Sequence, residues 1–259
     1  MVVVFMSRLH QKIKNGEISL GAWITISHPE IVDILSNMSF DWFVFDLEHA
    51  PLTIHDLEIM LIALKGSDIT PLVRVPWNDP VYIKQVIDLG VEGVIIPWVN
   101  TVDDVRNALR YVRYPPQGMR GVGPRRCVKY GFYDLKRYYE EWNREAIVIV
   151  QIETKEALEN IRSIVEIEGL TGVFVGPNDL SASLGVFRDF RNPVFIDALK
   201  RIVENSKYKL KIIGIMTYTP EDAIEKIDMG FNFIALASDY RYLIEGAKTF
   251  LQKVNRKIA

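Results

Sequence analysis

The segment KQVIDLGVEGVIIPWV at residues 84–99 sets the pattern of the chain. Its first half carries apolar residues at helical spacing, Gly90 follows, and a short run of β-branched residues typical of a buried strand comes next. The segment EKIDMG at residues 225–230 repeats the arrangement and also runs into an apolar stretch. Glycine at this place is typical of a helix C-terminus. Such recurrence predicts a repetitive α/β fold.

Eight apolar runs alternate with eight amphipathic stretches along the whole chain. The expected strands are 20–26, 42–47, 70–75, 93–99, 146–152, 172–175, 211–217 and 231–237. The expected helices are 29–38, 54–65, 80–89, 102–112, 155–165, 193–205, 220–229 and 240–254. A doubly wound sheet of this length would usually have fewer strands or a second domain. The sequence therefore predicts an α/β protein with a single (β/α)₈ TIM-barrel domain over residues 1–259.

Composition excludes several classes of partner and site. Because 33 acidic and 31 basic residues leave a net charge of −2, without a run of Lys and Arg, nucleic acid is not an expected partner. Cys127 is the single cysteine, so an intrachain disulfide and a thiolate zinc cage are excluded. The apolar opening, residues 1–6, is too short for a signal peptide, and no later apolar run approaches 18 residues. We expect a cytoplasmic protein without membrane contact.

Glu153 and Asp179 each follow an expected strand, the fifth and the sixth. Consecutive strands of a barrel are neighbours about 4.8 Å apart, so these carboxylates can meet at the end of the barrel where barrel enzymes work. Two oxygen ligands suit Mg²⁺ or Mn²⁺, with water and substrate completing the coordination. The alternative is that Glu153 caps the next helix and Asp179 forms a loop turn.

More ionisable residues follow the second and third strands. Asp46, Glu48 and His49 lie within four positions of one another. His49 can act as a general acid or base because its ordinary pKa is about 6.5, or it can be a surface residue. Arg74 ends the third strand, where a guanidinium needs an anionic partner. That partner is either a protein carboxylate or a substrate oxyanion.

Two further features are weaker candidates. The Gly- and Pro-rich loop at residues 113–123 offers backbone donors and Arg120 to an anion such as a phosphate or carboxylate. Trp23, Trp77 and Trp98 near strand ends are interpreted as packing residues, and Trp23 is kept as a candidate for the substrate pocket. The strand interiors hold no lysine for Schiff-base chemistry, so carbonyl chemistry would depend on a metal ion.

Five segments resemble the HpcH/HpaI aldolase family of metal-dependent pyruvate aldolases, in the family's order and through most of the chain. They are FDWFVFDLEHAP (40–51), VRVPWNDP (73–80), RYPPQGMRGVG (113–123), QIET (151–154) and GVFVGPNDLS (172–181). The resemblance implies the same barrel fold and a class II aldolase. Such an enzyme uses a divalent ion (Mg²⁺, Mn²⁺ or Co²⁺, with Zn²⁺ also compatible) to cleave a 4-hydroxy-2-oxoacid reversibly to pyruvate and an aldehyde.

The resemblance also implies roles for individual residues. Glu153 and Asp179 correspond to the metal ligands, and Arg74 to the arginine that holds the keto or enolate oxygen of pyruvate. His49 corresponds to the catalytic histidine, with Asp88 as the carboxylate of its dyad. From the sequence alone, Asp88 is instead a structural residue where a helix turns into a strand.

The family's carboxylate-binding backbone corresponds to Gly176, Pro177 and Asn178, and Asn178 departs from the usual Ala. Residues 216–218 and 239–242 are bulkier than is usual in the family, which leaves the aldehyde open. Family members are often hexamers whose subunits exchange the last helix. The apolar residues Tyr242, Leu243, Ala247, Phe250 and Leu251 are compatible with that exchange or with packing inside one chain.

Two other functions fit the same residues. One is a citrate-lyase-β-like or malyl-CoA-type lyase, which also binds a metal-chelated oxoacid but would need basic residues around the pocket for CoA. The other is a barrel that binds an oxoacid without catalysis. Activity on free hydroxy-oxoacids distinguishes the aldolase from both.

Overall fold

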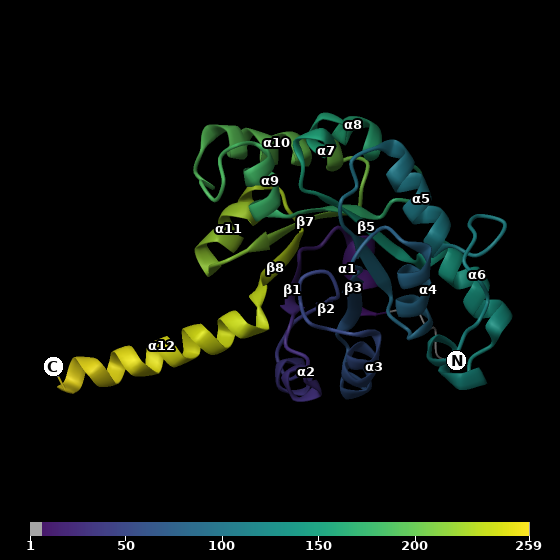
Figure 1. Ribbon diagram of the computed structural model, residues 1–259, viewed down its shortest axis with the longest axis horizontal. Helices are drawn as coiled ribbons and strands as arrows, with labels where there is room; N and C mark the ends of the chain where they lie inside the picture. Colours follow the sequence, from purple (N-terminus) through teal and green to yellow (C-terminus); the bar gives the residue numbers. More distant parts are fainter. Residues whose placement is uncertain (1–6, 259) are drawn as a thin grey trace.

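Eight parallel strands close into a barrel in sequence order, which confirms the predicted (β/α)₈ fold (Figure 1). This computed structural model describes residues 7–258, so the apolar segment 1–6 considered above as a leader lies outside the described residues. The strands are β1 (Ser19–Ile24), β2 (Trp42–Asp46), β3 (Thr70–Arg74), β4 (Gly93–Ile96), β5 (Ile147–Ile152), β6 (Gly172–Val175), β7 (Ile212–Thr217) and β8 (Phe233–Ser238). Each of the eight expected strands is present.

Most expected helices also form, and their first residues explain where they begin. They are α2 (Pro29–Ser36), α3 (Ile54–Ala63), α4 (Pro80–Asp88), α5 (Val102–Val112), α10 (Pro193–Ser206), α11 (Pro220–Met229) and α12 (Asp239–Ile258). Thr53 and Thr101 form capping boxes with Asp56 and Asp104. Proline occupies the first position of α4 and α11, where a backbone N–H is not needed.

The prediction of one helix over 155–165 is wrong. The chain forms α7 (Lys155–Glu159) and α8 (Ile161–Ile164), which meet at Asn160. The sequence prediction also missed α1 (Arg8–Asn15), the short helix η1 (Arg126–Gly131), α6 (Leu135–Glu145) and α9 (Pro177–Ser183). In α6 the residues Leu135, Tyr138, Tyr139 and Trp142 keep helical spacing, so the sequence carried a signal for this helix that was not used.

Helix α1 closes the N-terminal end of the barrel. The Lys12 ammonium lies 2.7 Å from Asp41 Oδ2, just before β2, and the His10 ring hydrogen-bonds to the Glu145 carbonyl, just before β5. Leu9 is fully buried in the cluster of side chains that fills the barrel. In that cluster Trp42 stacks on Phe233 with ring centres 3.8 Å apart. The barrel is a packed core, which leaves its opposite end for chemistry.

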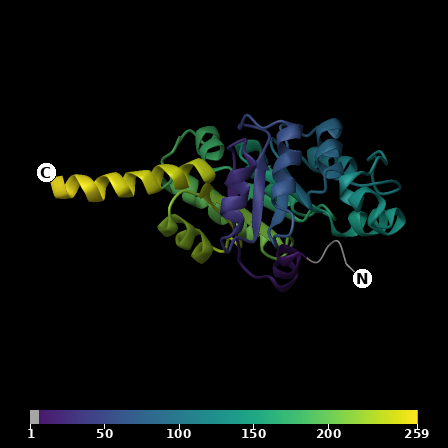
Figure 2. The same cartoon turned by 90° about the horizontal axis from the view of Figure 1, so that it is seen from below.

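Helix α12 leaves the barrel and projects away from it (Figures 1 and 2). Its apolar residues are exposed, with Phe250 76% and Leu251 63% accessible to solvent. Among the residues whose side chains the structure describes, those of α12 from 243 to 255 are all exposed. No helix in the described part of the chain has both the length and the apolar character needed to cross a membrane.

Candidate active site

A cavity of about 420 Å³ lies where the strands end and the following loops begin. Its walls come from most of the strands, so it gathers side chains that are distant in sequence. Among its lining residues are Trp23, Asp46, His49, Arg74, Gln151, Gly176, Pro177, Asn178, Asp179, Tyr218 and Arg241. Seven of the residues predicted for the site thus share one pocket, while Glu153, Asp88 and Arg120 do not line it.

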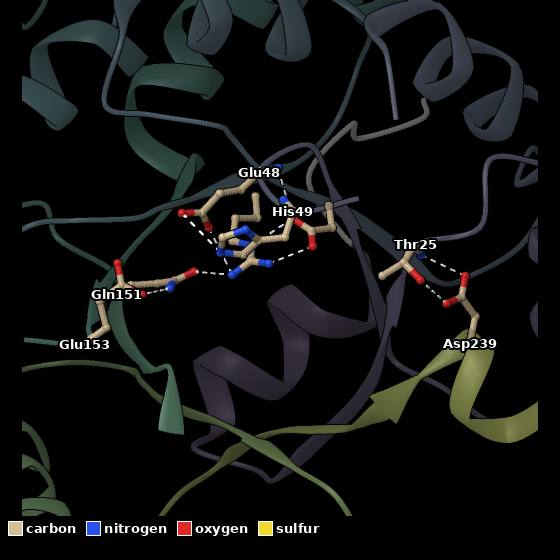
Figure 3. Close-up of polar contacts among 8 residues, drawn as sticks. Thr25, Glu48, His49, Gln151, Glu153 and Asp239 are labelled. Atoms are coloured by element: carbon tan, nitrogen blue, oxygen red, sulfur yellow. Dashed lines mark hydrogen bonds and ion pairs between the residues drawn. The ribbon is translucent and has the colours of Figure 1, made fainter. Parts of the chain in front are cut away.

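Glu153 lies directly after β5 and is buried, with Gln151 beside it (Figure 3), and both of its carboxylate oxygens accept hydrogen bonds. The Trp98 backbone N–H donates to Oε1 at 2.6 Å, and the Gln151 side-chain amide donates to Oε2. Trp98 has a positive φ of 55°, a strained backbone conformation next to this hydrogen bond. Burial raises the pKa of Glu153, and the nearby charge of Asp179 raises it further. The helix-cap alternative for Glu153 is wrong, because Thr154 caps α7.

Asp179 lies in the first turn of α9 and not in a loop turn. It comes close to Glu153 beside Gly176, which has no side chain. A Cβ at Gly176 would lie 3.2 Å from Glu153 Oε2 and 3.5 Å from Asp179 Oδ2. Across the described residues no three His, Cys, Asp or Glu side chains form a metal cluster. The protein therefore offers two converging carboxylates, a donor set that suits a hard divalent cation if water and substrate complete its coordination.

Arg74 is the buried cation of this end of the barrel. Its Nε and Nη2 donate to the two oxygens of Asp46 at 2.9 and 2.6 Å, and Nη1 lies 3.0 Å from Glu48 Oε2. Burial alone would lower the pKa of Arg74, but Asp46 and Glu48 raise it above its ordinary value. The partners of Arg74 within the chain are thus protein carboxylates. Gln151 Oε1, 3.4 Å from Nη1, connects this pair to Glu153.

The side chain of Glu48 is buried, only 8% exposed. Burial raises its pKa to about 7; Arg74 opposes that shift, and Glu153, Asp46 and Asp179 add to it. Asp46, Glu48 and Glu153 therefore act on Arg74, and Asp179 is a fourth carboxylate close to Glu48 and Glu153, so acidic groups outnumber this cation.

We expect Glu48 to make folding stability fall as pH rises from about 4.5 to about 7. The folded protein holds the Glu48 proton more tightly than the unfolded chain, whose reference pKa is 4.5, so the stabilisation present below pH 4.5 is lost as pH rises through the folded pKa. Glu48→Gln should flatten this part of the profile. Urea denaturation in the presence of a chelator, at a series of pH values, measures it, and an unchanged slope in the variant would contradict the assignment.

His49 lies at the pocket entrance with its side chain 68% exposed. Its Nε2 is 3.8 Å from Glu48 Oε1 (Figure 3). Asp88 lies elsewhere, at the C-terminal end of α4, where Arg120 Nη2 lies 2.5 Å from its Oδ1. A His49–Asp88 dyad is therefore not formed within one chain. The carboxylate beside His49 in this chain is Glu48.

Within one chain Arg120 lies away from the pocket, and its predicted role in substrate binding stays a prediction. Its side chain is completely buried and does not line the pocket. The guanidinium carbon lies 4.4 Å from the centre of the Tyr114 ring and 5.1 Å from that of Trp142. The interpretation of Asp88 as a structural residue between a helix and a strand fits this geometry, since the Asp88–Arg120 pair joins α4 to the loop after α5.

The three tryptophans near strand ends divide into two groups. Trp23 is buried in the pocket wall, 5.0 Å from Phe174 between ring centres and 5.3 Å from the Arg74 guanidinium carbon. Trp77 and Trp98 are 55% and 47% exposed, so the packing interpretation is wrong for them. Both lie on loops after strands, where an apolar run does not imply burial.

Gln151 was not assigned a role from the sequence, although its spacing carried a signal. Residues two apart in a strand point to the same face, so this spacing puts Gln151 on the same side as Glu153. Tyr218 and Arg241 were noted as bulky, but no sequence pattern indicated that β7 and α12 would bring them to one pocket.

Comparison with known proteins finds aldolases along nearly the whole chain. A 5-keto-4-deoxy-D-glucarate aldolase of Escherichia coli O139:H28 (strain E24377A) is 35% identical over 237 residues, 91% of this chain and 92% of that protein. A solved HpcH/HpaI aldolase/citrate lyase family protein of Burkholderia cenocepacia J2315 is 29% identical with a TM-score of 0.90, covering 96% and 100% of the two chains.

A more distant barrel is the citrate lyase β subunit of M. tuberculosis, solved with oxaloacetate and magnesium. It is 13% identical with a TM-score of 0.56, covering 89% and 95% of the two chains, which shows the fold alone.

The barrel fold together with these relatives indicates a carbon–carbon lyase of the class II aldolase type. The HpcH/HpaI aldolase/citrate lyase family model matches residues 19–246, all eight strands. The chain belongs to this family.

Proposed function

We propose that the chain holds a divalent cation between Glu153 and Asp179 and cleaves 4-hydroxy-2-oxoacids reversibly to pyruvate and an aldehyde. One observation carries the proposal: the carboxylates of Glu153 and Asp179 converge beside Gly176, which lines the pocket. The acidic side chains in this region outnumber its buried cation, Arg74. Mg²⁺, Mn²⁺ and Co²⁺ suit these oxygen ligands, and Zn²⁺ is also compatible. When bound, the ion supplies a Lewis acid that polarises the keto group of the oxoacid.

Arg74 would face the keto or enolate oxygen of pyruvate, supporting the negative charge that develops there. Asp46 holds the guanidinium through two hydrogen bonds, so its orientation is fixed before substrate binds. The backbone at Gly176, Pro177 and Asn178 would receive the pyruvate carboxylate. Trp23 would cover this end of the pocket and exclude water.

A panel assay tests the proposal directly. The protein is incubated with several 4-hydroxy-2-oxoacids after treatment with chelator, then with Mg²⁺, Mn²⁺, Co²⁺ or Zn²⁺ added back, and pyruvate is measured. We expect pyruvate release only with metal. Absence of turnover on every free hydroxy-oxoacid would contradict the aldolase. In that outcome, metal-dependent binding of oxalate would favour the non-catalytic barrel, and turnover of acyl-CoA substrates would favour the malyl-CoA-type lyase.

We propose that His49 moves the proton on or off the aldol hydroxyl, directly or through water. His49→Ala should lower kcat for cleavage by about 10²–10⁴-fold, the range of general acid–base catalysis, with little change in metal binding. His55→Ala, which removes an exposed histidine of α3, is the matched control. Wild-type turnover in the His49 variant would remove this role.

We also propose that the exposed face of α12 packs against another copy of the chain. A helix that leaves its own barrel with Phe250 and Leu251 in solvent loses the hydrophobic stabilisation that burial would provide. We expect an oligomer, up to a hexamer, in light scattering of the full chain. A Phe250→Asp/Leu251→Asp double variant should shift the mass to smaller species, and a monomeric wild-type protein would contradict the proposal.

A further inference from the structure

The loop after β4 and the segment after β5 are joined by three hydrogen bonds around Glu153. The first is the bond from the Trp98 backbone N–H to Glu153 Oε1 at 2.6 Å. One residue after Glu153, the Thr154 hydroxyl donates to the side-chain oxygen of Asn100. The Asn160 side-chain amide donates to the backbone carbonyl of the same Asn100 at 2.9 Å. The two segments are therefore connected on both sides of the Trp98–Glu153 bond.

Asn160 lies where α7 ends and α8 begins, inside the stretch for which the sequence predicted one helix. Its φ of −89° and ψ of 0° lie in the sparsely populated bridge region and end α7 after Glu159. From this position its side chain reaches Asn100, 60 residues away in the sequence. The stretch 155–165 holds no Gly or Pro that would break a helix by itself. The break therefore coincides with a contact to the loop after β4.

Asn100 is the point at which this loop is held. Its backbone N–H donates to Asp104 Oδ2 at 3.0 Å, its side-chain oxygen accepts from Thr154, and its carbonyl accepts from Asn160. Trp98, two residues earlier, has the strained positive φ. A strained backbone persists only where the surrounding structure holds it. The bonds to Asn100 supply that support, and with it they hold the Trp98 N–H beside Glu153.

We infer that Asn160 is a positioning residue for Glu153, acting through Asn100 and the Trp98 N–H. This inference rests on the proposed function, in which Glu153 and Asp179 bind a divalent cation. Without the Asn160 amide, the loop loses one of the bonds that maintain its strained conformation, and Glu153 loses a fixed donor at Oε1. Groups that hold a metal ligand in place orient it and tune its affinity, and their removal typically weakens metal binding about 10- to 100-fold.

Hydrogen exchange of the chelator-treated protein, followed by mass spectrometry, tests the first step without metal. We expect Asn160→Ala to speed exchange of the Trp98 amide, because the loop is held less firmly. Asn232→Ala is the matched control. It removes another half-buried asparagine, which donates to the Lys211 carbonyl at 2.9 Å at the opposite end of the barrel. It should leave the exchange of Trp98 unchanged, and wild-type exchange at Trp98 in Asn160→Ala would overturn the inference.

A Mn²⁺ titration followed by electron paramagnetic resonance tests the second step. We expect Asn160→Ala to raise the Kd for Mn²⁺ about 10-fold. Asn100→Ala, which removes the side-chain partner of Thr154, should raise it in the same way. Asn232→Ala should keep the wild-type Kd, which separates a local effect on Glu153 from a general loss of stability.

The wild-type protein separates failure of this inference from failure of the proposed function. If the wild type binds Mn²⁺ and Asn160→Ala raises the Kd no more than Asn232→Ala does, the inference is overturned and the proposed function stands. If the wild type itself binds no Mn²⁺, the proposed function is overturned, and the role of Asn160 toward a metal ligand falls with it.

Discussion

Glu153→Gln and Asp179→Asn are each expected to lower metal-dependent pyruvate release by about 10³-fold or more. Each change removes one of two anionic ligands, and a metal ion contributes several kcal/mol of charge stabilisation to reactions of this kind. Both variants should also bind Mn²⁺ far more weakly in a titration followed by electron paramagnetic resonance. Folding should be retained, because burial raises the pKa of Glu153 and a neutral amide relieves that burial cost.

Glu156→Gln is the matched control, since it removes an exposed carboxylate of α7 three residues from Glu153. Its activity and Mn²⁺ affinity should equal those of the wild type. Full Mn²⁺ affinity in either Glu153→Gln or Asp179→Asn would show that the cation binds elsewhere.

Arg74→Ala is expected to affect both stability and activity. It leaves the carboxylates of Asp46 and Glu48 without their buried cation, a change that costs about 3–5 kcal/mol of unfolding free energy in comparable sites. Pyruvate release should fall by about 10²-fold or more, because the developing oxyanion loses a fixed donor. Urea denaturation and the pyruvate assay measure the two effects.

Arg74→Lys separates these effects. Lysine keeps the charge beside Asp46 and Glu48 but not the two-point grip that orients the guanidinium. We expect it to recover most of the stability and little of the activity. Equal recovery of both would mean that Arg74 serves the fold and has no separate part in the reaction.

The fold was predictable because its strands are buried on both faces. Each strand of a closed barrel covered by helices reads as an unbroken apolar run, so all eight were identified. Helices were predicted where an apolar stripe or a capping box marked them: α5 has both, and α3 has the capping box. The short α9 was missed because PNDLSAS carries turn-forming residues, and α1 because few of its side chains are buried.

The candidate site was only partly predictable. Residues directly after strands, such as Glu153 and Asp179, could be placed because barrel topology fixes where strands end. Long side chains could not, since the sequence does not state their direction. Arg74 turned to Asp46 and Glu48, while Arg120 turned away from the pocket to Asp88. The roles of His49 and Asp88 stay predictions.

The closure of one barrel end by α1 has a kinetic consequence. With Leu9 and the stacked Trp42 and Phe233 filling the interior, reactants and products share a single route to solvent. Pyruvate would lie at the inner end of the pocket, near Glu153 and Asp179. The aldehyde would form closer to Arg241, between pyruvate and the solvent. Cleavage should therefore release the aldehyde first and pyruvate second, so product-inhibition patterns should show an ordered mechanism in which pyruvate alone competes with the substrate.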